Sequence, residues 1–177
     1  MKTPRWYVMR VFQNQRAAEE KLLSPTYGLS HFIPKREVIR TRHGKKIICQ
    51  EPVIHSLIFV HATREEILTF KQNYFNDLQF VARHTMDGFQ YLTVPDRDMD
   101  HFLRLYHARY DKVTYYLPSQ LNIEKGKRVR VHGGPLDTLE GYFVKVAHKR
   151  NRQLVILIPD TLAISAQVED GIIEVLD

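Results

Sequence analysis

The sequence has 177 residues, a formal net charge of +6 and an apolar fraction of 44%. This length suits one ordinary domain or two small ones, and the apolar fraction is too high for a disordered chain. No apolar run approaches the length of a membrane span, and the single Cys49 excludes an intramolecular disulfide. The charged N-terminus does not resemble a signal peptide, so a reducing cytoplasm is the expected setting.

The positive charge is concentrated in the N-terminal two thirds of the chain. Residues 123–177 contain 8 Lys or Arg and 8 Asp or Glu, whereas residues 1–122 contain 18 basic and 12 acidic residues. A localised basic excess indicates a polyanionic partner such as nucleic acid. The alternative is a charge that only keeps the chain soluble.

The first predicted elements are a strand and a helix. The run Trp6–Phe12 is rich in β-branched and aromatic residues, which predicts a buried strand. Asn14 can cap a helix that begins at Gln15, and the pair Ser24-Pro25 should end it.

A basic hairpin and an apolar strand follow. His31–Ile39 has a strand pattern, Thr41–Gly44 is typical of a turn, and the chain returns as a strand from Lys46. The almost wholly apolar run Pro52–Ala62 predicts a central strand.

Two further helices and two strands complete the first part. Thr63–Glu66 has the form of a capping box, which predicts a helix. Strands are predicted at 78–83 and 89–94, joined by a turn at Asp87-Gly88. A third helix should begin at Pro95-Asp96. Its apolar face comprises Met99, Phe102, Leu103 and Tyr106.

These elements predict an α+β protein with two domains. An antiparallel sheet covered by helices should occupy residues 1–110, and residues 111–122, where the pattern lapses, should form a linker. Only short strands remain in residues 123–177, which predicts a small closed five-stranded β-barrel. The expected strands are Arg128–His132, Gly141–Ala147, Leu154–Ile158, Ile164–Val168 and Ile172–Leu176.

The stretch GKRVRVHGGPLDTLEG opens the predicted barrel. Its two valines can point inward, and its glycines permit sharp bends. The spacing of these residues resembles the KOW motif of NusG/Spt5-type transcription factors and of some ribosomal proteins. The motif residues are Gly126, Val129, Val131, Gly134, Pro135 and Gly141.

Three stretches of the N-terminal part resemble the NusG N-terminal (NGN) domain, in the expected order. WYVMRVFQNQRAAEEKL resembles its first strand and helix, and FIPKREVIRTRHGKK resembles its second strand and hairpin. EPVIHSLIFV resembles the strand that usually reads EPLFPGYLFV. The chain is thus identified as a member of the NusG/Spt5 family, most similar to specialised paralogues of the UpxY and RfaH antiterminator type.

The resemblance implies a non-enzymatic transcription elongation factor. The NGN domain of this family docks on the clamp helices of RNA polymerase through an apolar patch and suppresses pausing or termination. The residues that match this patch are Tyr7, Ile54, Leu57 and Phe59. Aromatic anchors of the family are absent here, because Ile54 and Leu57 replace Phe and Tyr. Strand alternation should bury about half of the four residues.

Two groups of polar residues are expected to contact DNA or nascent RNA in the elongation complex. The first group consists of basic residues of the predicted hairpin that can bind phosphates: Lys35, Arg36, Arg40, Arg42, Lys45 and Lys46. The second matches the region that reads an exposed single strand in RfaH-type paralogues: Gln13, Asn14 and Arg16. The alternatives are a solvated loop for the hairpin and a simple helix cap for Asn14.

The resemblance also implies the remaining partners. The KOW domain would recruit a ribosomal protein or Rho, and the antiterminator paralogues act on surface-polysaccharide operons. We expect a cytoplasmic monomer that does not bind a membrane.

Other classes of function have weaker signatures. Cys49 has no matching catalytic triad, the nine histidines are scattered, and Asp96–Asp100 lacks the glycine and closing glutamate of a calcium loop. We therefore expect no catalytic residue, no metal and no cofactor. The remaining alternative is a KOW-type RNA- or ribosome-binding protein without polymerase contact.

Overall fold

The computed structural model describes residues 3–108 and 112–176. The chain divides into two compact units, Met1–Pro95 and Asp96–Asp177. The sequence pattern instead placed the boundary at residues 111–122. The division falls earlier because the third helix, α3 (Asp96–Ala108), packs against strands of the C-terminal unit, and because Thr114–Tyr116 within the predicted linker forms a strand of that unit.

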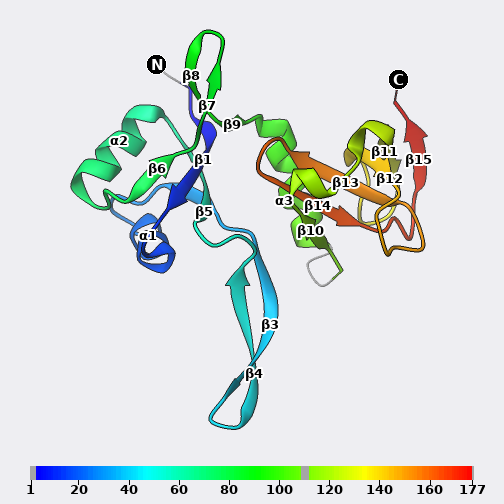
Figure 1. Ribbon diagram of the computed structural model, residues 1–177, viewed down its shortest axis with the longest axis horizontal. Helices are drawn as coiled ribbons and strands as arrows, with labels where there is room; N and C mark the ends of the chain where they lie inside the picture. Colours follow the sequence, from blue (N-terminus) through cyan, green and yellow to red (C-terminus); the bar gives the residue numbers. More distant parts are fainter. Residues whose placement is uncertain (1–2, 109–111, 177) are drawn as a thin grey trace. The chain divides into compact units, whose positions relative to one another are not determined.

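The first unit is built on an antiparallel sheet of five strands (Figure 1). The strand order is β2-β5-β1-β6, and β9 also pairs with β1. The strands are β1 (Arg5–Val11), β2 (Ser30–Phe32), β5 (Leu57–Ala62), β6 (Leu78–Phe80) and β9 (Thr93–Val94).

Two helices cover one face of this sheet, and both are capped as the sequence predicts. In α1 (Gln15–Leu22) the Asn14 side chain accepts a hydrogen bond from the Ala17 N–H at 2.9 Å. In α2 (Arg64–Asn73) Thr63 and Glu66 form the predicted capping box. These caps satisfy backbone N–H groups that have no partner within the helix.

The core of the first unit lies between the two helices and the sheet. It comprises Met9, Val11, Ala18, Leu22, Ile33, Ile58, Val60, Ala62, Ile67, Phe70 and Leu78. Residues 9 and 11 of β1 and residues 58, 60 and 62 of β5 therefore point to the helices. Their neighbours in each strand point to the opposite face of the sheet.

Two hairpins extend from this sheet. Four stretches that the sequence predicts as single strands are each divided in the structure. The hairpins are β3 (Lys35–Arg42) with β4 (Lys45–Pro52) and β7 (Ala82–Thr85) with β8 (Gly88–Tyr91). Residues 31–39 form two strands because Pro34, which has no N–H, separates β2 from β3. Residues 52–62 also divide, since a turn in which Ser56 has φ +83° precedes β5. Residues 78–83 and 89–94 are likewise shared between the main sheet and the second hairpin.

The second unit combines α3 with a sheet of six strands in the order β10-β14-β13-β12-β11-β15. Two short 3-10 helices, Pro118–Gln120 and Ile123–Lys125, precede β11. The strands are β10 (Thr114–Tyr116), β11 (Lys127–His132), β12 (Glu140–Val144), β13 (Gln153–Ile158), β14 (Leu162–Ala166) and β15 (Ile172–Val175).

The five predicted C-terminal strands are present, but the closed five-stranded barrel is not seen. β10 pairs with the edge of β14, and β15 pairs with β11. Among the described residues no pairing joins β14 or β10 to β15, so the sheet is open. The physical reason is that β10 occupies the strand edge that barrel closure would need.

Candidate functional site

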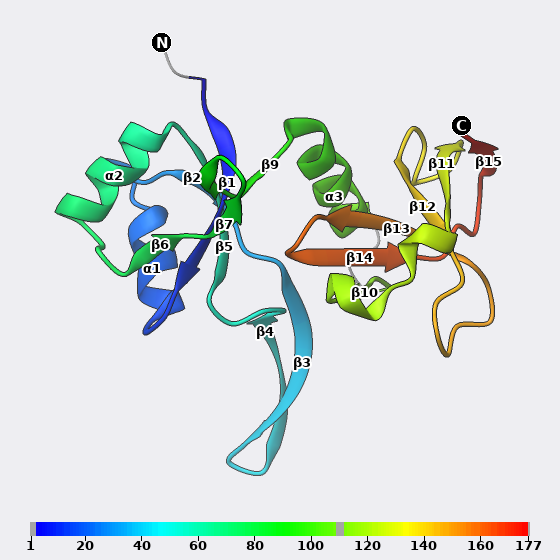
Figure 2. The same cartoon turned by 45° about the horizontal axis from the view of Figure 1, so that its top comes forward.

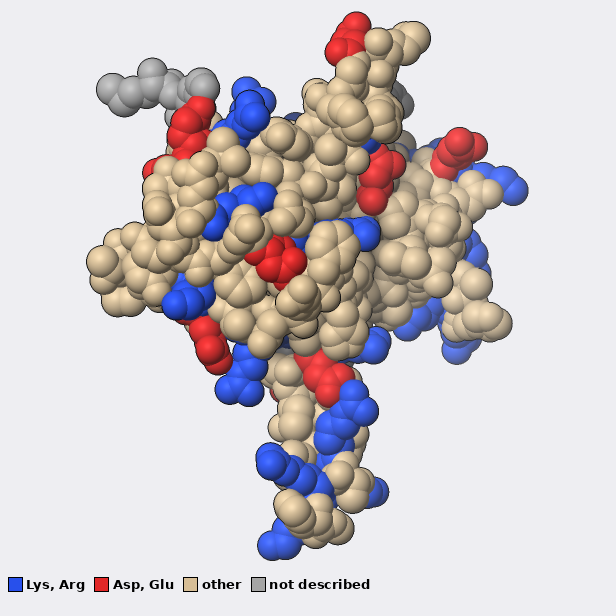
Figure 3. Space-filling view, turned by 60° about the vertical axis from the view of Figure 1, so that its left-hand side comes forward, with Lys and Arg blue, Asp and Glu red and all other residues tan. Residues whose placement is uncertain are grey.

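The β3–β4 hairpin is an exposed basic feature of the first unit. All eight residues of each strand pair in register, from Lys35 with Pro52 to Arg42 with Lys45. The turn is His43-Gly44, and both residues have positive φ, 50° and 75°. Figures 1 and 2 show the hairpin extending well beyond the sheet of its unit. Lys and Arg side chains gather along it in Figure 3.

Strand alternation divides the six predicted basic residues between the two faces of the hairpin. Arg36, Arg40, Arg42 and Lys45 share one face, and Lys35 and Lys46 lie on the other. Two of the six already have carboxylate partners. Lys35 Nζ lies 2.6 Å from Glu19 Oε1, and Arg40 donates two hydrogen bonds of 2.7 Å to Glu51.

The Arg40–Glu51 pair partly neutralises the base of the hairpin. Its hydrogen bonds lower the pKa of Glu51 and raise the pKa of Arg40, so both groups stay charged. Within the described chain Arg42, Lys45 and Lys46 have no ion pair. The charge available to a phosphate is therefore concentrated around the His43-Gly44 turn.

The hairpin also exposes apolar side chains that the sequence analysis did not single out. Ile39 and Ile48 are directly opposite each other, and both are exposed. Ile47 is exposed on the other face. The sequence carried no signal for their exposure, because a strand pattern does not show whether the strand belongs to the main sheet or to a hairpin that extends from it.

The polar group near α1 has local partners. Asn14 is the helix cap, the Gln13 N–H donates to Asp77 Oδ2 at 2.9 Å, and Arg16 lies 3.1 Å from Glu20 Oε1. All three of Gln13, Asn14 and Arg16 are exposed, so Gln13 and Arg16 keep side-chain groups that can reach a ligand.

Gln15, the next residue after the cap, fixes the turn before β5. Its Nε2 donates to the Leu57 carbonyl at 2.8 Å, and its Oε1 accepts from the Ser56 N–H at 3.1 Å. These bonds hold Ser56 in the left-handed region where the family motif has glycine. The turn that carries Ile54 thus lies beside the start of α1. Sequence reasoning missed this role because the two segments are 41 residues apart.

The four residues expected to form an apolar docking patch do not share one surface. Tyr7 packs against the core cluster on the helix-covered face. Leu57 and Phe59 alternate with Ile58 and point to the opposite face, and they are only 3% and 0% exposed. Ile54 is partly buried in the turn before β5.

The motif residues of the C-terminal unit have structural roles. Val129 and Val131 are buried. A Cβ at Gly126 would overlap Val144, one at Gly134 would overlap Asp170, and one at Gly141 would overlap Val155. The three glycines are therefore required by close packing and, at Gly134, by φ +70°. Pro135 lies exposed beside the Gly133-Gly134 bend.

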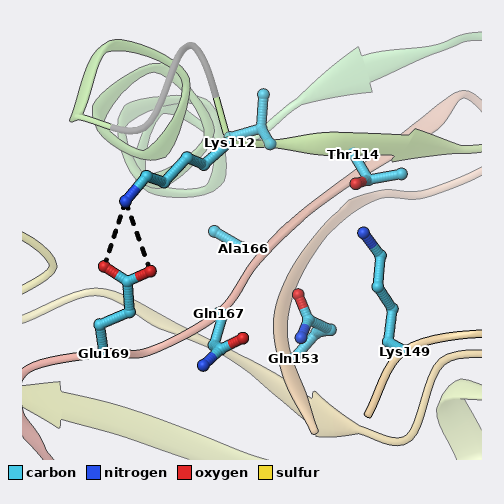
Figure 4. Close-up of a pocket in the computed structure, with 8 residues that line it drawn as sticks. Lys112, Thr114, Lys149, Gln153, Ala166, Gln167 and Glu169 are labelled. Atoms are coloured by element: carbon cyan, nitrogen blue, oxygen red, sulfur yellow. Dashed lines mark hydrogen bonds and ion pairs between the residues drawn. The ribbon is translucent and has the colours of Figure 1, made fainter. Parts of the chain in front are cut away.

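The C-terminal unit also has a polar pocket of about 410 Å³ (Figure 4). Its lining consists of Lys112, Val113, Thr114, Lys149, Gln153, Ala166, Gln167 and Glu169. Lys112 Nζ lies 3.4 Å from a carboxylate oxygen of Glu169. The pocket mixes both charges with amides and has no nucleophile–base pair among its described residues.

No group of three or more His, Cys, Asp or Glu in the described part of the chain could hold a metal ion. No helix in residues 3–108 or 112–176 is long and apolar enough to cross a membrane.

The chain thus combines an α+β unit that carries a basic hairpin with a β-sheet unit that has a polar pocket. Comparison with family models gives one finding: the family described as "Transcription termination factor nusG" matches residues 4–103. A comparison with curated proteins gives no match. Because the family match spans more than half of the 177 residues, the chain belongs to the NusG family. This is a family of transcription factors, not of enzymes, and its members bind RNA polymerase.

The family match extends eight residues into α3, past the division after Pro95. It does not reach the stretch Gly126–Gly141, so the KOW domain and the paralogue type stay predictions.

Proposed function

We propose that this chain is a NusG-like transcription elongation factor and processive antiterminator. The observation that supports this most directly is the family match over residues 4–103, which contains the whole first unit apart from its first three residues. The N-terminal domain would bind the clamp helices of RNA polymerase and suppress pausing or termination. Binding would favour the closed clamp, which is a population shift and needs no catalytic residue.

The proposed polymerase contact centres on the turn before β5. Ile54 lies in this turn, and Gln15 holds the turn in place through two hydrogen bonds. Tyr7, Leu57 and Phe59 would support the contact from the sheet. Because Leu57 and Phe59 are buried, they would act by supporting the turn that carries Ile54.

The proposed contact with DNA or nascent RNA uses the outer half of the β3–β4 hairpin. Arg42, Lys45 and Lys46 supply positive charge there, and Arg36 adds to it nearer the base. Gln13 and Arg16 form a second polar contact beside α1. Phosphate binding by several such cations is strongly dependent on salt.

Residues 123–177 would act as a KOW domain that recruits Rho or a ribosomal protein. The resemblance to UpxY-type paralogues supports surface-polysaccharide operons as targets. We place the protein in the cytoplasm as a monomer.

The test is binding of the full chain to a reconstituted bacterial elongation complex. Ile54→Asp should weaken binding at least tenfold, because burial of a carboxylate in an apolar contact is unfavourable. Leu23→Asp, which changes an exposed leucine at the end of α1, is the matched control and should leave binding unchanged.

The hairpin is tested in the same complex with Arg42→Gln and Lys45→Gln combined. Loss of two phosphate contacts should reduce the slope of log K against log salt by about 1.4–1.8.

An unchanged affinity of Ile54→Asp for the elongation complex would refute the proposed clamp contact. If the full chain binds free RNA but no elongation complex, the KOW-type RNA- or ribosome-binding alternative replaces the proposal.

A further inference from the structure

The β7–β8 hairpin presents an aromatic face that the proposed function does not use. In its register Ala82 pairs with Tyr91 and His84 pairs with Phe89. Because side chains alternate along a strand, His84, Phe89 and Tyr91 share one face. Every residue from 82 to 91 is exposed, and 75% of Phe89 is accessible. In Figure 1 this hairpin stands at the top of its unit, away from β3 and β4.

The rings on this face are ordered by contacts with one another. The ring centroids of His84 and Phe89 are 3.9 Å apart. Tyr91 stacks on Phe80 at 4.5 Å with an interplanar angle of 24°. Phe80 in turn packs against the core cluster and meets the edge of Tyr7 at 5.4 Å. Phe80 therefore connects Tyr91 to the core, whereas the outer rings of His84 and Phe89 contact each other.

Two cations from α2 lie over the inner rings. The Arg64 guanidinium carbon is 5.2 Å from the ring centroid of Tyr91, and Lys71 Nζ is 5.6 Å from that of Phe80. Lys71 also donates to Gln79 Oε1 at 3.1 Å, so its ammonium group is held beside the aromatic series. Such contacts place positive charge next to flat apolar surfaces.

Exposed rings with adjoining cations suit one class of ligand. In single-stranded nucleic acid the bases can stack on aromatic side chains while the phosphates approach basic groups. An apolar protein partner would use the rings but would gain nothing from the cations. The hairpin from Ala82 to Tyr91 contains a single acidic residue, Asp87, at its turn.

We propose that the β7–β8 hairpin is a stacking platform for unpaired bases of DNA or RNA. His84 and Phe89 form the stacking position, because the Tyr91 ring already contacts Phe80 and the Arg64 guanidinium. The proposal goes beyond the proposed function, which places nucleic acid on the β3–β4 hairpin and beside α1.

The experiment measures fluorescence anisotropy of a labelled thymidine oligonucleotide of about 12 nucleotides, a length within the usual site size. The full chain is used, and a uridine oligonucleotide of the same length distinguishes DNA from RNA. Phe89→Ala should weaken binding about tenfold through loss of one stacked base. Phe89→Trp should retain binding, and its added indole emission should be quenched by the oligonucleotide.

Leu23→Ala is the matched control, because Leu23 is 65% exposed in the same unit and carries no ring. It should bind as the wild type does. Phe89→Ala should leave the salt dependence unchanged, since no phosphate contact is removed, whereas Arg42→Gln with Lys45→Gln should reduce it. This difference separates the platform from the basic hairpin.

Wild-type affinity of Phe89→Ala, or no binding of either oligonucleotide, would overturn the platform. If Phe89→Ala instead loses only the elongation complex and not the oligonucleotides, the hairpin is a protein contact and the inference is wrong. Oligonucleotide binding is measured without polymerase, so the two proposals are tested independently. A negative oligonucleotide result does not affect the proposed clamp contact, and a negative elongation-complex result does not affect the proposed stacking platform.

Discussion

Glu140 forms ion pairs with three arginines of the C-terminal unit, and its replacement by glutamine should destabilise that unit. Its Oε1 accepts hydrogen bonds from Arg130 at 2.6 and 3.0 Å and lies 2.5 Å from Arg97 Nη2. Arg128 lies 3.8 Å from Oε2. Glu140→Gln keeps the shape of the side chain but removes the charge, so the guanidinium groups surround a neutral amide.

The expected loss follows from how far each partner is exposed. The Glu140 side chain is 6% exposed, while Arg130 and Arg97 are 37% and 60% exposed. Breaking a fully buried pair costs about 3–5 kcal/mol, and an exposed pair contributes about 0–1 kcal/mol. With a buried carboxylate and half-exposed arginines, we expect the free energy of unfolding to fall by about 2 kcal/mol.

Amide hydrogen exchange in β11 and β12 is the appropriate assay, because it reports opening of the second unit separately from the first. Exchange from these strands should accelerate in Glu140→Gln, while exchange from β1 and β5 should not change. Glu124→Gln, which alters an exposed carboxylate in the segment before β11, is the control and should match the wild type.

The pH dependence gives a second, independent measurement. The hydrogen bond from Arg130 is the main reason that the pKa of Glu140 lies below its ordinary value of 4.5. A carboxylate whose pKa is lower in the folded state stabilises the fold above its unfolded pKa. This stabilisation decreases as the pH falls through the folded pKa. The wild type should therefore lose more stability than Glu140→Gln between about pH 5 and pH 3. Parallel pH curves for the two proteins, or an unchanged stability of Glu140→Gln at neutral pH, would refute this reasoning.

Two further changes should stabilise the protein. Ser56→Gly should raise the free energy of unfolding of the first unit by about 1 kcal/mol, because Ser56 has φ +83° and glycine adopts this conformation without strain. Chemical denaturation monitored by Trp6 fluorescence measures this, and Ser56→Ala should give no gain. Ser165→Ala should stabilise the second unit by about 1 kcal/mol, since Ser165 Oγ is buried and has no hydrogen-bond partner among the described residues. Slower exchange from β14 would support this prediction, faster exchange would contradict it, and the exposed Ser119→Ala should have no effect.

Local sequence signals predicted the helices of the first unit well. Asn14 and the Thr63–Glu66 capping box mark the starts of α1 and α2, since a cap involves only residues within one turn. The Asp87-Gly88 turn was predicted for the same reason. The basic hairpin was also recognisable, because a turn signal at Thr41–Gly44 joins two strand patterns.

Predictions that depended on distant neighbours were less complete. Pro52–Ala62 reads as one apolar strand, but the chain turns at Ser56, where Gln15 supplies the hydrogen bonds. No sequence pattern links these residues. The closed barrel was wrong because Thr114–Tyr116, in the stretch assigned to the linker, adds to the edge of β14.

The sequence by itself determined the family, the two capped helices of the first unit and the position of the basic hairpin. The helix caps and the hairpin turn are local, so each can be recognised within a few consecutive residues. The tertiary structure alone decided which side chains are accessible. It separated Tyr7 from Leu57 and Phe59, paired Arg40 with Glu51, and brought Phe80 and Tyr91 together on an exposed aromatic face. Burial and pairing depend on strands that are far apart in the chain, and a periodic pattern specifies alternation but not which face is covered.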